Sequence, residues 1–268
     1  MARRVGLIAG GGAFPLLFAR AAREQGCEVV CVAHQGETDP AIERHADQLT
    51  WVSLGQLNKL VKALKAGGAA EVVLAGAISK QAMYHAKPDL KAMLLLAKLR
   101  DYSDDAILRL LAQELEANGL KVANPIDYLH DMLAPAGRLA GPKPTPEQMK
   151  DVAVGMRLAR EIGRLDIGQT VVVKTKAVVA VEAMEGTDAC IKRAAELCGP
   201  GAVVAKACKP IQDVRFDLPA VGPRTIEVMA KARAAVLAVE AGKTIVFERE
   251  ELARLADGAA IAVLAVEE

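Results

Sequence analysis

Lysine, arginine and aspartate alternate within one short stretch, residues 205–222, in a frame of two prolines and a glycine. Its cations can neutralise phosphate oxygens, and arginine does so with a planar fork of N–H donors. Its carboxylates are ligands for a hard divalent cation such as Mg²⁺, which usually also keeps waters and substrate phosphates. The stretch therefore predicts a phosphate-handling site with a metal. The residues concerned are Lys206, Lys209, Asp213, Arg215 and Asp217.

Taken alone, such a stretch is equally compatible with a solvated loop whose charges pair with one another. A second acidic cluster, Glu182, Glu185 and Asp188, favours the metal interpretation, since it also follows a β-like run. Capping of a helix N-terminus explains Thr187 well, but it explains Glu182 poorly because that residue lies on an otherwise apolar strand. If the two clusters converge, they make a divalent-metal site with open positions.

Composition excludes several classes of function. The chain has 268 residues and a formal net charge of +1, so no global field selects for nucleic acid, and no basic block with interleaved aromatics occurs. Five cysteines without a C-x-x-C pair, and four scattered histidines, predict neither a disulfide framework nor a zinc site. The N-terminus predicts a strand rather than a signal peptide, and no apolar run is long enough to span a membrane. We expect a cytoplasmic protein with reduced thiols.

The elements that must position these residues alternate between strands and helices. In the first half we expect strands at 4–9, 28–33, 48–53, 71–76 and 121–123, and helices at 15–25, 56–65, 90–99 and 104–118. In the second half we expect strands at 169–174, 177–183, 202–207, 234–239, 244–247 and 261–266, and helices at 147–162, 188–197, 223–232 and 249–256. This alternation of strands and helices predicts an α/β protein with a Rossmann-like parallel sheet at its N-terminus and right-handed crossovers.

A change in composition marks the domain boundary. Residues 134–146 are rich in proline and glycine and end in Pro-Lys-Pro-Thr-Pro, so we interpret them as a linker. The prediction is a nucleotide- or phosphate-binding domain over 1–133 and a catalytic α/β domain over 147–268. The step from Lys174 to Lys176 is expected to turn a hairpin within the second domain.

Further candidates follow the strands of the first domain. Gly10-Gly11-Gly12 between a strand and a helix is placed like a phosphate loop, although a tight turn without a ligand is the alternative. The third glycine of a dinucleotide fingerprint is replaced by Pro15, and no acid ends the second strand, so a mononucleotide fits better than NAD. Ser79 and Lys80 follow the fourth strand at the same sheet edge, where Ser79 is alternatively only a helix cap. Asn124 is a weaker candidate because Asn-Pro commonly marks a turn.

Several motifs occur in an order that resembles the LpxI family, the UDP-2,3-diacylglucosamine pyrophosphatases of lipid A biosynthesis. The resemblance spans essentially the whole chain, and the last two motifs are the most specific in combination. The motifs are the glycine segment at 6–12 with Pro15, Gly76–Lys80, Asp104–Arg109 with 120–122, 165–169, 179–188 and Lys209–Pro219.

This resemblance implies a two-domain protein that holds a lipid-linked nucleotide between its domains. It implies Mg²⁺-dependent hydrolysis of the pyrophosphate to UMP and 2,3-diacylglucosamine 1-phosphate, with Asp217 essential and Thr187-Asp188 in the same site. It also implies a homodimer. Because the substrate is amphiphilic, we expect transient contact with the inner membrane, and the apolar helix at 90–99 is a candidate wall for acyl chains.

Cleavage of a phosphoanhydride requires neutralised phosphate oxygens, a stabilised leaving group and an activated water. We therefore assign catalysis to Asp217, Asp188 and Arg215, and metal binding to Asp217, Asp188 and Asp213; whether each acid is a ligand or a base is left open. We assign substrate binding to Gly11, Gly12, Ala13, Ser79, Lys80, Asn124, Lys174, Glu185, Thr187, Lys206 and Lys209.

Two other classes of function compete with this assignment. A nucleotide-sugar transferase or an NAD(P) oxidoreductase would use the glycine loop, although the broken fingerprint counts against the oxidoreductase. A metabolite-binding regulator would need only the α/β sensor fold. A regulator of this kind does not require two acidic clusters beside three cations, and the sequence shows no helix-turn-helix output module.

Overall fold

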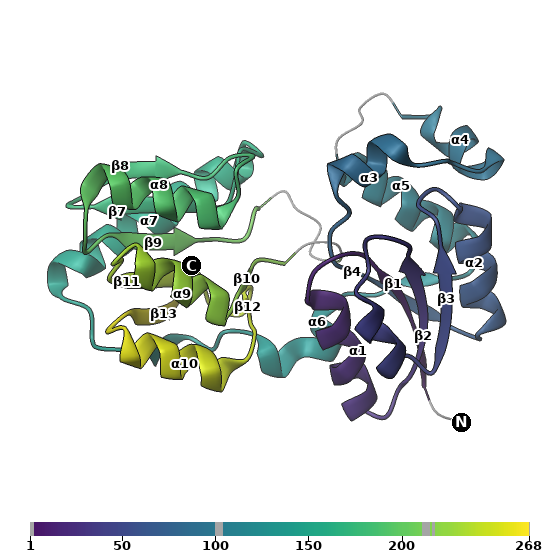
Figure 1. The fold of residues 1–268 in the computed structure, drawn as a ribbon, viewed down its shortest axis with the longest axis horizontal. Helices are drawn as coiled ribbons and strands as arrows, with labels where there is room; N and C mark the ends of the chain where they lie inside the picture. Colours follow the sequence, from purple (N-terminus) through teal and green to yellow (C-terminus); the bar gives the residue numbers. More distant parts are fainter. Residues whose placement is uncertain (1–2, 100–103, 211–214, 216–217, 268) are drawn as a thin grey trace. The chain divides into compact units, whose positions relative to one another are not determined.

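The computed structural model describes residues 3–99, 104–210, 215 and 218–267. The chain forms two compact units. The first contains residues 3–130 together with Arg215, and the second contains the remainder of the described chain (Figure 1). Both units are α/β, so the predicted fold class is confirmed.

The first unit is built on a five-stranded parallel sheet with the order β3-β2-β1-β4-β5. Its strands are β1 (Arg4–Ala9), β2 (Glu28–His34), β3 (Gln48–Val52), β4 (Glu71–Ala75) and β5 (Lys121–Val122). The strand order reverses between β1 and β4, which is where ligands bind in doubly wound sheets. The carboxyl ends of β1 and β4 therefore position the first candidate site.

Helices cover this sheet and bury its apolar strands. They are α1 (Phe14–Glu24), the 3₁₀ helix η1 (Pro40–Arg44), α2 (Leu57–Ala66), α3 (Lys80–His85), α4 (Leu90–Leu96), α5 (Asp104–Ala117) and α6 (Ile126–Leu129). The apolar faces of α2, α4 and α5 pack with β-strand residues in one core that includes Leu64 and Leu115. On α1, Phe18 meets the ring of Tyr128 of α6 edge-on, with ring centroids 5.2 Å apart. Apolar residues at helical spacing thus fold as the sequence predicts.

The second unit contains a six-stranded mixed sheet with the order β6-β13-β11-β9-β7-β8. Its strands are β6 (Gly137–Ala140), β7 (Thr170–Lys174), β8 (Ala177–Val181), β9 (Val203–Lys206), β11 (Val236–Glu240) and β13 (Ala262–Val266). Strands β9, β11 and β13 are parallel, whereas β6 and β7 are antiparallel to their neighbours. Four residues of the predicted linker thus form β6, an edge strand. The boundary itself stays a prediction.

Helices lie on both faces of the second sheet. They are α7 (Pro146–Arg164), α8 (Thr187–Cys198), α9 (Pro223–Lys231) and α10 (Arg249–Gly258), and a short 3₁₀ helix, η2 (His130–Met132), precedes them. One core joins α7 to one face of the sheet, and another joins α8, α9 and α10 to the other face. A separate two-stranded pair, β10 (Ala220–Val221) and β12 (Ile245–Val246), completes the unit.

Two local predictions of the second unit are confirmed. Thr145 caps α7 in a capping box, in which its hydroxyl accepts from the N–H of Gln148, and Pro146 occupies the first turn. Strands β7 and β8 form the expected hairpin. The backbone N–H groups of its turn residues, Thr175 and Lys176, donate to the buried carboxylate of Asp151 on α7.

Candidate functional site

The glycine loop after β1 lies against the loop after β4. The N–H of Gly10 donates to Ala75 O at 2.8 Å, and Gly11 and Ala77 exchange a pair of backbone hydrogen bonds at 2.7 and 3.2 Å. Gly76 has φ +86°, and a Cβ there would lie 2.5 Å from Gly11 O, so no larger residue fits without a shift. Part of the glycine pattern therefore serves the close approach of these two loops.

The open part of the glycine loop is its third residue. Gly12 has φ +86°, and a Cβ at this position would meet no atom within 4 Å. Ala13 is the N-cap of α1, and its side chain makes no capping hydrogen bond. The N-terminus of a helix favours an anion, because its backbone N–H groups and the positive end of the helix dipole point towards it. Gly12 and Ala13 thus fit the phosphate prediction, whereas Gly11 has a structural role as well.

Ser79 is a helix cap, as the alternative interpretation held. Its hydroxyl accepts from the N–H of Ala82 at 3.1 Å and thereby caps α3. The same hydroxyl and the N–H of Ser79 both donate to the carboxylate of Glu37, at 2.9 and 2.8 Å. Sequence reasoning missed Glu37 because it considered only the last residues of the second strand. Lys80 begins α3, and its side chain lies outside the described part of the structure.

Two other polar residues of this edge have structural roles. Asn124 accepts from the N–H of Ile126 at 3.0 Å, which is the turn that Asn-Pro predicts. His34 is buried, and its Nδ1 lies 2.9 Å from Ala9 O, at the end of β1. Burial lowers the pKa of His34, so its imidazole is neutral at pH 7 and acts as part of the core.

The second unit gathers polar groups at the start of α8. Thr187 Oγ1 donates to Glu182 Oε1 at 2.9 Å and accepts from Lys206 Nζ at 3.4 Å. Lys206, the last residue of β9, also donates to Ala220 O at 3.1 Å. Glu182 and Lys206 are both buried. The structure therefore brings Thr187, Lys206 and Glu182 together.

Asp188 and Glu185 flank this group and have cationic partners. Asp188 Oδ2 accepts from Arg224 Nε of α9 at 2.9 Å, and 32% of the Asp188 side chain is exposed. Glu185 accepts from Arg193 of α8 at 2.5 Å and from the N–H of Ala183 at 3.0 Å. Hydrogen bonds from its own N–H and from Arg193 hold the pKa of Glu185 below its usual range, so it stays ionised.

The remaining cations of the central stretch belong to different units and have different partners. Lys209 pairs with Asp166 at 2.8 Å. Arg215 belongs to the first unit, where it pairs with Glu116 of α5 at 3.1 Å. Asp213 and Asp217 lie outside the described residues, so their predicted roles stay predictions.

Lys174 is not brought together with the other candidates. Strand β7 runs antiparallel to β8 and β9, so its first residue, Thr170, lies beside Lys206. Lys174 ends β7 and donates to Cys198 O at 2.6 Å, at the C-terminus of α8, whereas Thr187 begins that helix. The two places lie at opposite ends of a helix of twelve residues, which is about 18 Å long at 1.5 Å per residue.

A second buried charge cluster lies at the end of β11. Glu240 accepts from Arg160 Nε of α7 at 3.0 Å and from the N–H of Cys208 at 2.9 Å. Only 3% of the Glu240 side chain is exposed. Cys208 directly precedes Lys209 in the stretch 205–222. Its hydrogen bond to Glu240 therefore holds the backbone of this stretch in place beside Lys209. Sequence reasoning missed this pair, because 80 residues separate its members.

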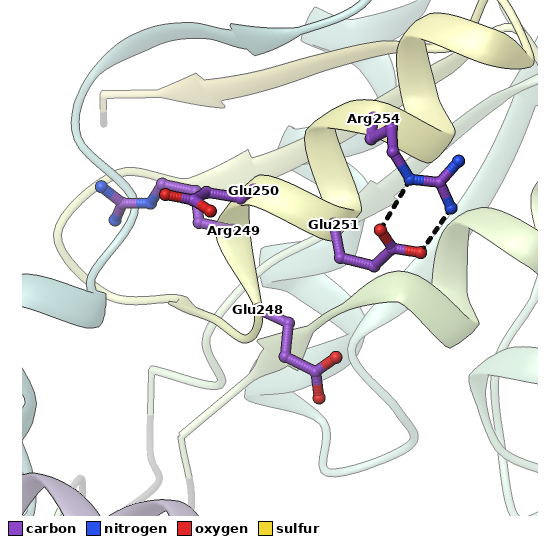
Figure 2. A pocket seen from close by; sticks show the side chains of 5 residues that line it. All are labelled: Glu248, Arg249, Glu250, Glu251 and Arg254. Atoms are coloured by element: carbon purple, nitrogen blue, oxygen red, sulfur yellow. Dashed lines mark hydrogen bonds and ion pairs between the residues drawn. The ribbon is translucent and has the colours of Figure 1, made fainter.

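A hollow of about 520 Å³ lies at the start of α10, and Figure 2 shows its charged lining. Glu251 and Arg254 pair through two hydrogen bonds of 2.6 and 2.7 Å. Arg249 donates to the carbonyls of Asp131 and Leu133. Because Arg249, Glu251 and Arg254 already bond to one another or to the backbone, we assign no site to this hollow.

Within the described residues, no group of three or more His, Cys, Asp or Glu side chains is arranged to hold a metal. Of the three predicted metal ligands, only Asp188 is described. Its carboxylate oxygens are of the kind that Mg²⁺ prefers. A search of the described helices also finds none that could cross a membrane.

Comparison with known proteins covers nearly the whole chain. Residues 4–132 match the model of the LpxI N-terminal domain, and residues 135–264 match that of the LpxI C-terminal domain. The UDP-2,3-diacylglucosamine pyrophosphatase LpxI of Caulobacter vibrioides is 39% identical over 280 residues, which cover 99% of this chain and 98% of that protein.

Solved structures give weaker matches. A glycinamide-RNase-transformylase T from Mycobacterium tuberculosis is 18% identical, covering 68% of this chain and 44% of that one, with a TM-score of 0.26. The biotin carboxylase domain of a Hydrogenobacter thermophilus 2-oxoglutarate carboxylase is 15% identical, covering 66% and 36%, with a TM-score of 0.30. This chain spans less than half of either protein, and superpositions of this quality carry no argument about function.

Proposed function

Because the chain belongs to the LpxI family, we propose that it hydrolyses the pyrophosphate bond of UDP-2,3-diacylglucosamine, a step of lipid A biosynthesis. The products are UMP and 2,3-diacylglucosamine 1-phosphate, so the protein is a hydrolase that acts on a phosphoanhydride. The observation that carries this proposal is the 39% identity to the Caulobacter enzyme over 99% of the chain. Both family domains are present in the expected order.

The described geometry offers binding groups that suit this reaction. The N-terminus of α1, next to the open Gly12, suits one phosphate. The ammonium of Lys206 lies at the start of α8, so its charge and the helix dipole favour an anion at the same place. Groups of this kind stabilise the charge that develops on phosphate oxygens in the transition state. We assign the N-terminus of α1 and the start of α8 to binding of the nucleotide phosphate and the sugar phosphate. Either site can bind either phosphate in this assignment.

We propose that hydrolysis depends on Mg²⁺, with Asp188, Asp213 and Asp217 as the residues that would hold it. When bound, the ion would neutralise charge on the pyrophosphate oxygens. The part-exposed carboxylate of Asp188, which pairs with the exposed Arg224, supports this assignment. Asp217, in the Arg-x-Asp-Leu-Pro motif, would hold the metal or orient the attacking water.

The test is release of UMP from dispersed UDP-2,3-diacylglucosamine by purified protein, with Mg²⁺ and with EDTA. We expect turnover that requires the metal, is lost in Asp217→Ala and persists in Glu196→Ala, which removes an exposed acid from α8. Circular dichroism of each variant reports its fold. A folded wild-type protein without turnover would contradict the reaction, and an active Asp217→Ala protein would contradict the role of Asp217.

We also propose that α4 makes contact with a lipid surface, from which the diacyl substrate is taken. Among the residues described in the first unit, the exposed large apolar side chains all lie on α4: Leu90 (67% exposed), Met93 (49%) and Leu94 (61%). Their spacing places them on one face of the helix. Burial of a leucine side chain contributes about 1.5–3 kcal/mol, so three side chains suit weak, reversible attachment.

Flotation with vesicles of phosphatidylethanolamine and phosphatidylglycerol measures this contact. The double substitution Leu90→Gln/Leu94→Gln is expected to reduce the bound fraction at least tenfold. Leu197→Gln is the matched control, because Leu197 is 66% exposed on α8 of the second unit. Equal flotation of wild type and the double variant would exclude α4 as the contact. Sedimentation equilibrium of the same proteins tests the homodimer that the family resemblance implies.

A further inference from the structure

A carboxylate lies where the ends of three strands meet in the first unit. Strand β1 lies between β2 and β4, so the loops that follow these strands share one edge of the sheet (Figure 1). Glu37 follows His34, the last residue of β2, by three positions. Its carboxylate accepts from the N–H and the hydroxyl of Ser79, in the loop after β4, at 2.8 and 2.9 Å. Glu37 therefore reaches across the end of β1, which carries the glycine loop.

Two buried neighbours fix the backbone of Glu37. His34 Nδ1 and the hydroxyl of Thr38 both lie within hydrogen-bond distance of Ala9 O, at 2.9 and 2.6 Å. The N–H groups of Glu37 and Thr38 both donate to His34 O, at 3.2 and 3.0 Å, which closes the turn. A Cβ on Gly11 would lie only 3.2 Å from Glu37 O, so this turn also packs against the glycine loop. The fold thus sets the place of Glu37 beside the predicted phosphate site.

The carboxylate of Glu37 has the capacity to accept further hydrogen bonds. An ionised carboxylate has about four acceptor positions, two on each oxygen. The N–H of Ser79 uses one position on Oε2, and the Ser79 hydroxyl uses one on Oε1. One position therefore remains on each oxygen beyond these two contacts. Two adjacent hydroxyl groups of a ligand can donate to the two oxygens together.

The charge of Glu37 restricts the kind of group that it can bind. The N-terminus of α1 and the open Gly12 beside it suit a phosphate, whereas a carboxylate repels one. Glu37 must therefore meet a hydrogen-bond donor that lies next to the phosphate in the same ligand. In doubly wound sheets, an acid beyond the second strand binds ribose hydroxyls while the phosphate lies at the first strand–helix turn. The UDP group of the proposed substrate contains both a phosphate and two adjacent ribose hydroxyls.

We propose that Glu37 binds the ribose 2′- and 3′-hydroxyl groups of the uridine nucleotide, while the nucleotide phosphate lies at the glycine loop. This inference rests on the proposed function and deepens it, because it assigns the nucleotide to the first unit. Each ribose hydroxyl donates to one carboxylate oxygen. The two hydrogen bonds from Ser79 fix the plane of the carboxylate, since they end on different oxygens. No acid ends β2 itself, and Glu37 supplies one from the turn that follows.

The first test compares nucleotides on wild-type protein by isothermal titration calorimetry, without turnover. The probes are UMP, 2′-deoxy-UMP and 3′-deoxy-UMP. Each deoxy analogue removes one hydrogen bond to a charged acceptor, so each should bind about tenfold or more weakly than UMP. Equal affinities for UMP and either analogue would overturn the contact with the missing hydroxyl. Wild-type protein that does not bind UMP at millimolar concentration would overturn the whole site.

The second test repeats the titrations on variants. Glu37→Gln keeps the size of the side chain, but it removes the charge and turns one acceptor into a donor. It should weaken UMP binding about tenfold and leave the affinity for 2′,3′-dideoxy-UMP nearly unchanged. Glu24→Gln is the matched control, because Glu24 is an exposed acid at the C-terminal end of α1, and it should keep the wild-type discrimination. Circular dichroism reports the fold of each variant.

Other roles of Glu37 predict different patterns. If Glu37 only held the loop after β4, Glu37→Gln would weaken UMP and 2′,3′-dideoxy-UMP equally, and the proposal would be refuted. If it bound the base, the variant would lose discrimination against N3-methyl-UMP and keep that against the deoxy analogues, which would also overturn the proposal.

Release of UMP from UDP-2,3-diacylglucosamine tests the proposed reaction separately. Discrimination that depends on Glu37, in a wild-type protein without turnover, would support the ribose site and refute the reaction. Turnover without such discrimination would support the reaction and refute the ribose site.

Discussion

Removal of Glu240 should strongly destabilise the second unit. The side chain is 3% exposed and accepts hydrogen bonds from Arg160 Nε at 3.0 Å and from the N–H of Cys208 at 2.9 Å, with Lys243 Nζ 3.5 Å away. Arg160 Nη2 is buried without a hydrogen-bond partner among the described atoms, so this guanidinium depends on Glu240 for compensation. Removing one member of a buried ion pair costs about 3–5 kcal/mol. We expect Glu240→Ala to lower the free energy of unfolding by about 4 kcal/mol.

Urea unfolding followed by circular dichroism measures this loss, and it also separates the charge effect from packing. Glu240→Gln should cost about 2 kcal/mol, because its amide oxygen can replace only one carboxylate acceptor. In the double variant Arg160→Met/Glu240→Leu both charges are replaced by apolar groups, and most of the stability should return. A loss below about 1 kcal/mol in Glu240→Ala would refute the reasoning, since the pair would then contribute no more than a surface salt bridge.

Two further predictions concern the first unit. Hydrogen bonds from Lys121 and Arg3 hold the pKa of Glu71 at about 2, so its stabilisation is complete above pH 4.5 and is lost as pH falls towards 2. Glu71→Gln should therefore weaken the dependence of the free energy of unfolding on pH below 4.5. Urea titrations at several pH values measure this dependence, and an unchanged dependence would argue against these ion pairs. Gly76→Ala should cost about 1–3 kcal/mol and displace the glycine loop, because its Cβ would lie 2.5 Å from Gly11 O; a melting temperature equal to that of wild type would contradict this.

Much of the fold could be predicted because the signals are local. The alternation of apolar strands with amphipathic helices gives both sheets, and the capping box at Thr145 fixes the start of α7. Some short elements were missed, although the two-residue strand β12 was predicted. Strand β10 has two residues, and α6 has four, too few for a hydrophobic period to be seen. The edge strand β6 was hidden within a segment whose prolines and glycines predict a linker.

The candidate site was predicted less completely, because sheet topology decides which strand ends meet. Thr187 and Lys206, both assigned to substrate binding, lie in one cluster because each begins or ends an element at the same sheet edge. Lys174 was assigned to the same site, but it does not lie there. Strand β7 is antiparallel to β9, so its N-terminal residue, Thr170, lies at that edge instead. Pairing direction is a long-range property that one strand's sequence does not contain.

Glu182 and Glu240 show what could still be extracted from the sequence. Each lies at the end of an apolar strand run and is buried, and each accepts hydrogen bonds from a different element. The part-exposed acid Asp188 instead pairs with the exposed Arg224, and a pair of this kind contributes little to stability. Burial therefore separates Glu182 and Glu240 from Asp188. An acid that ends an apolar strand run is thus a sequence signal for a carboxylate that hydrogen-bonds within the fold.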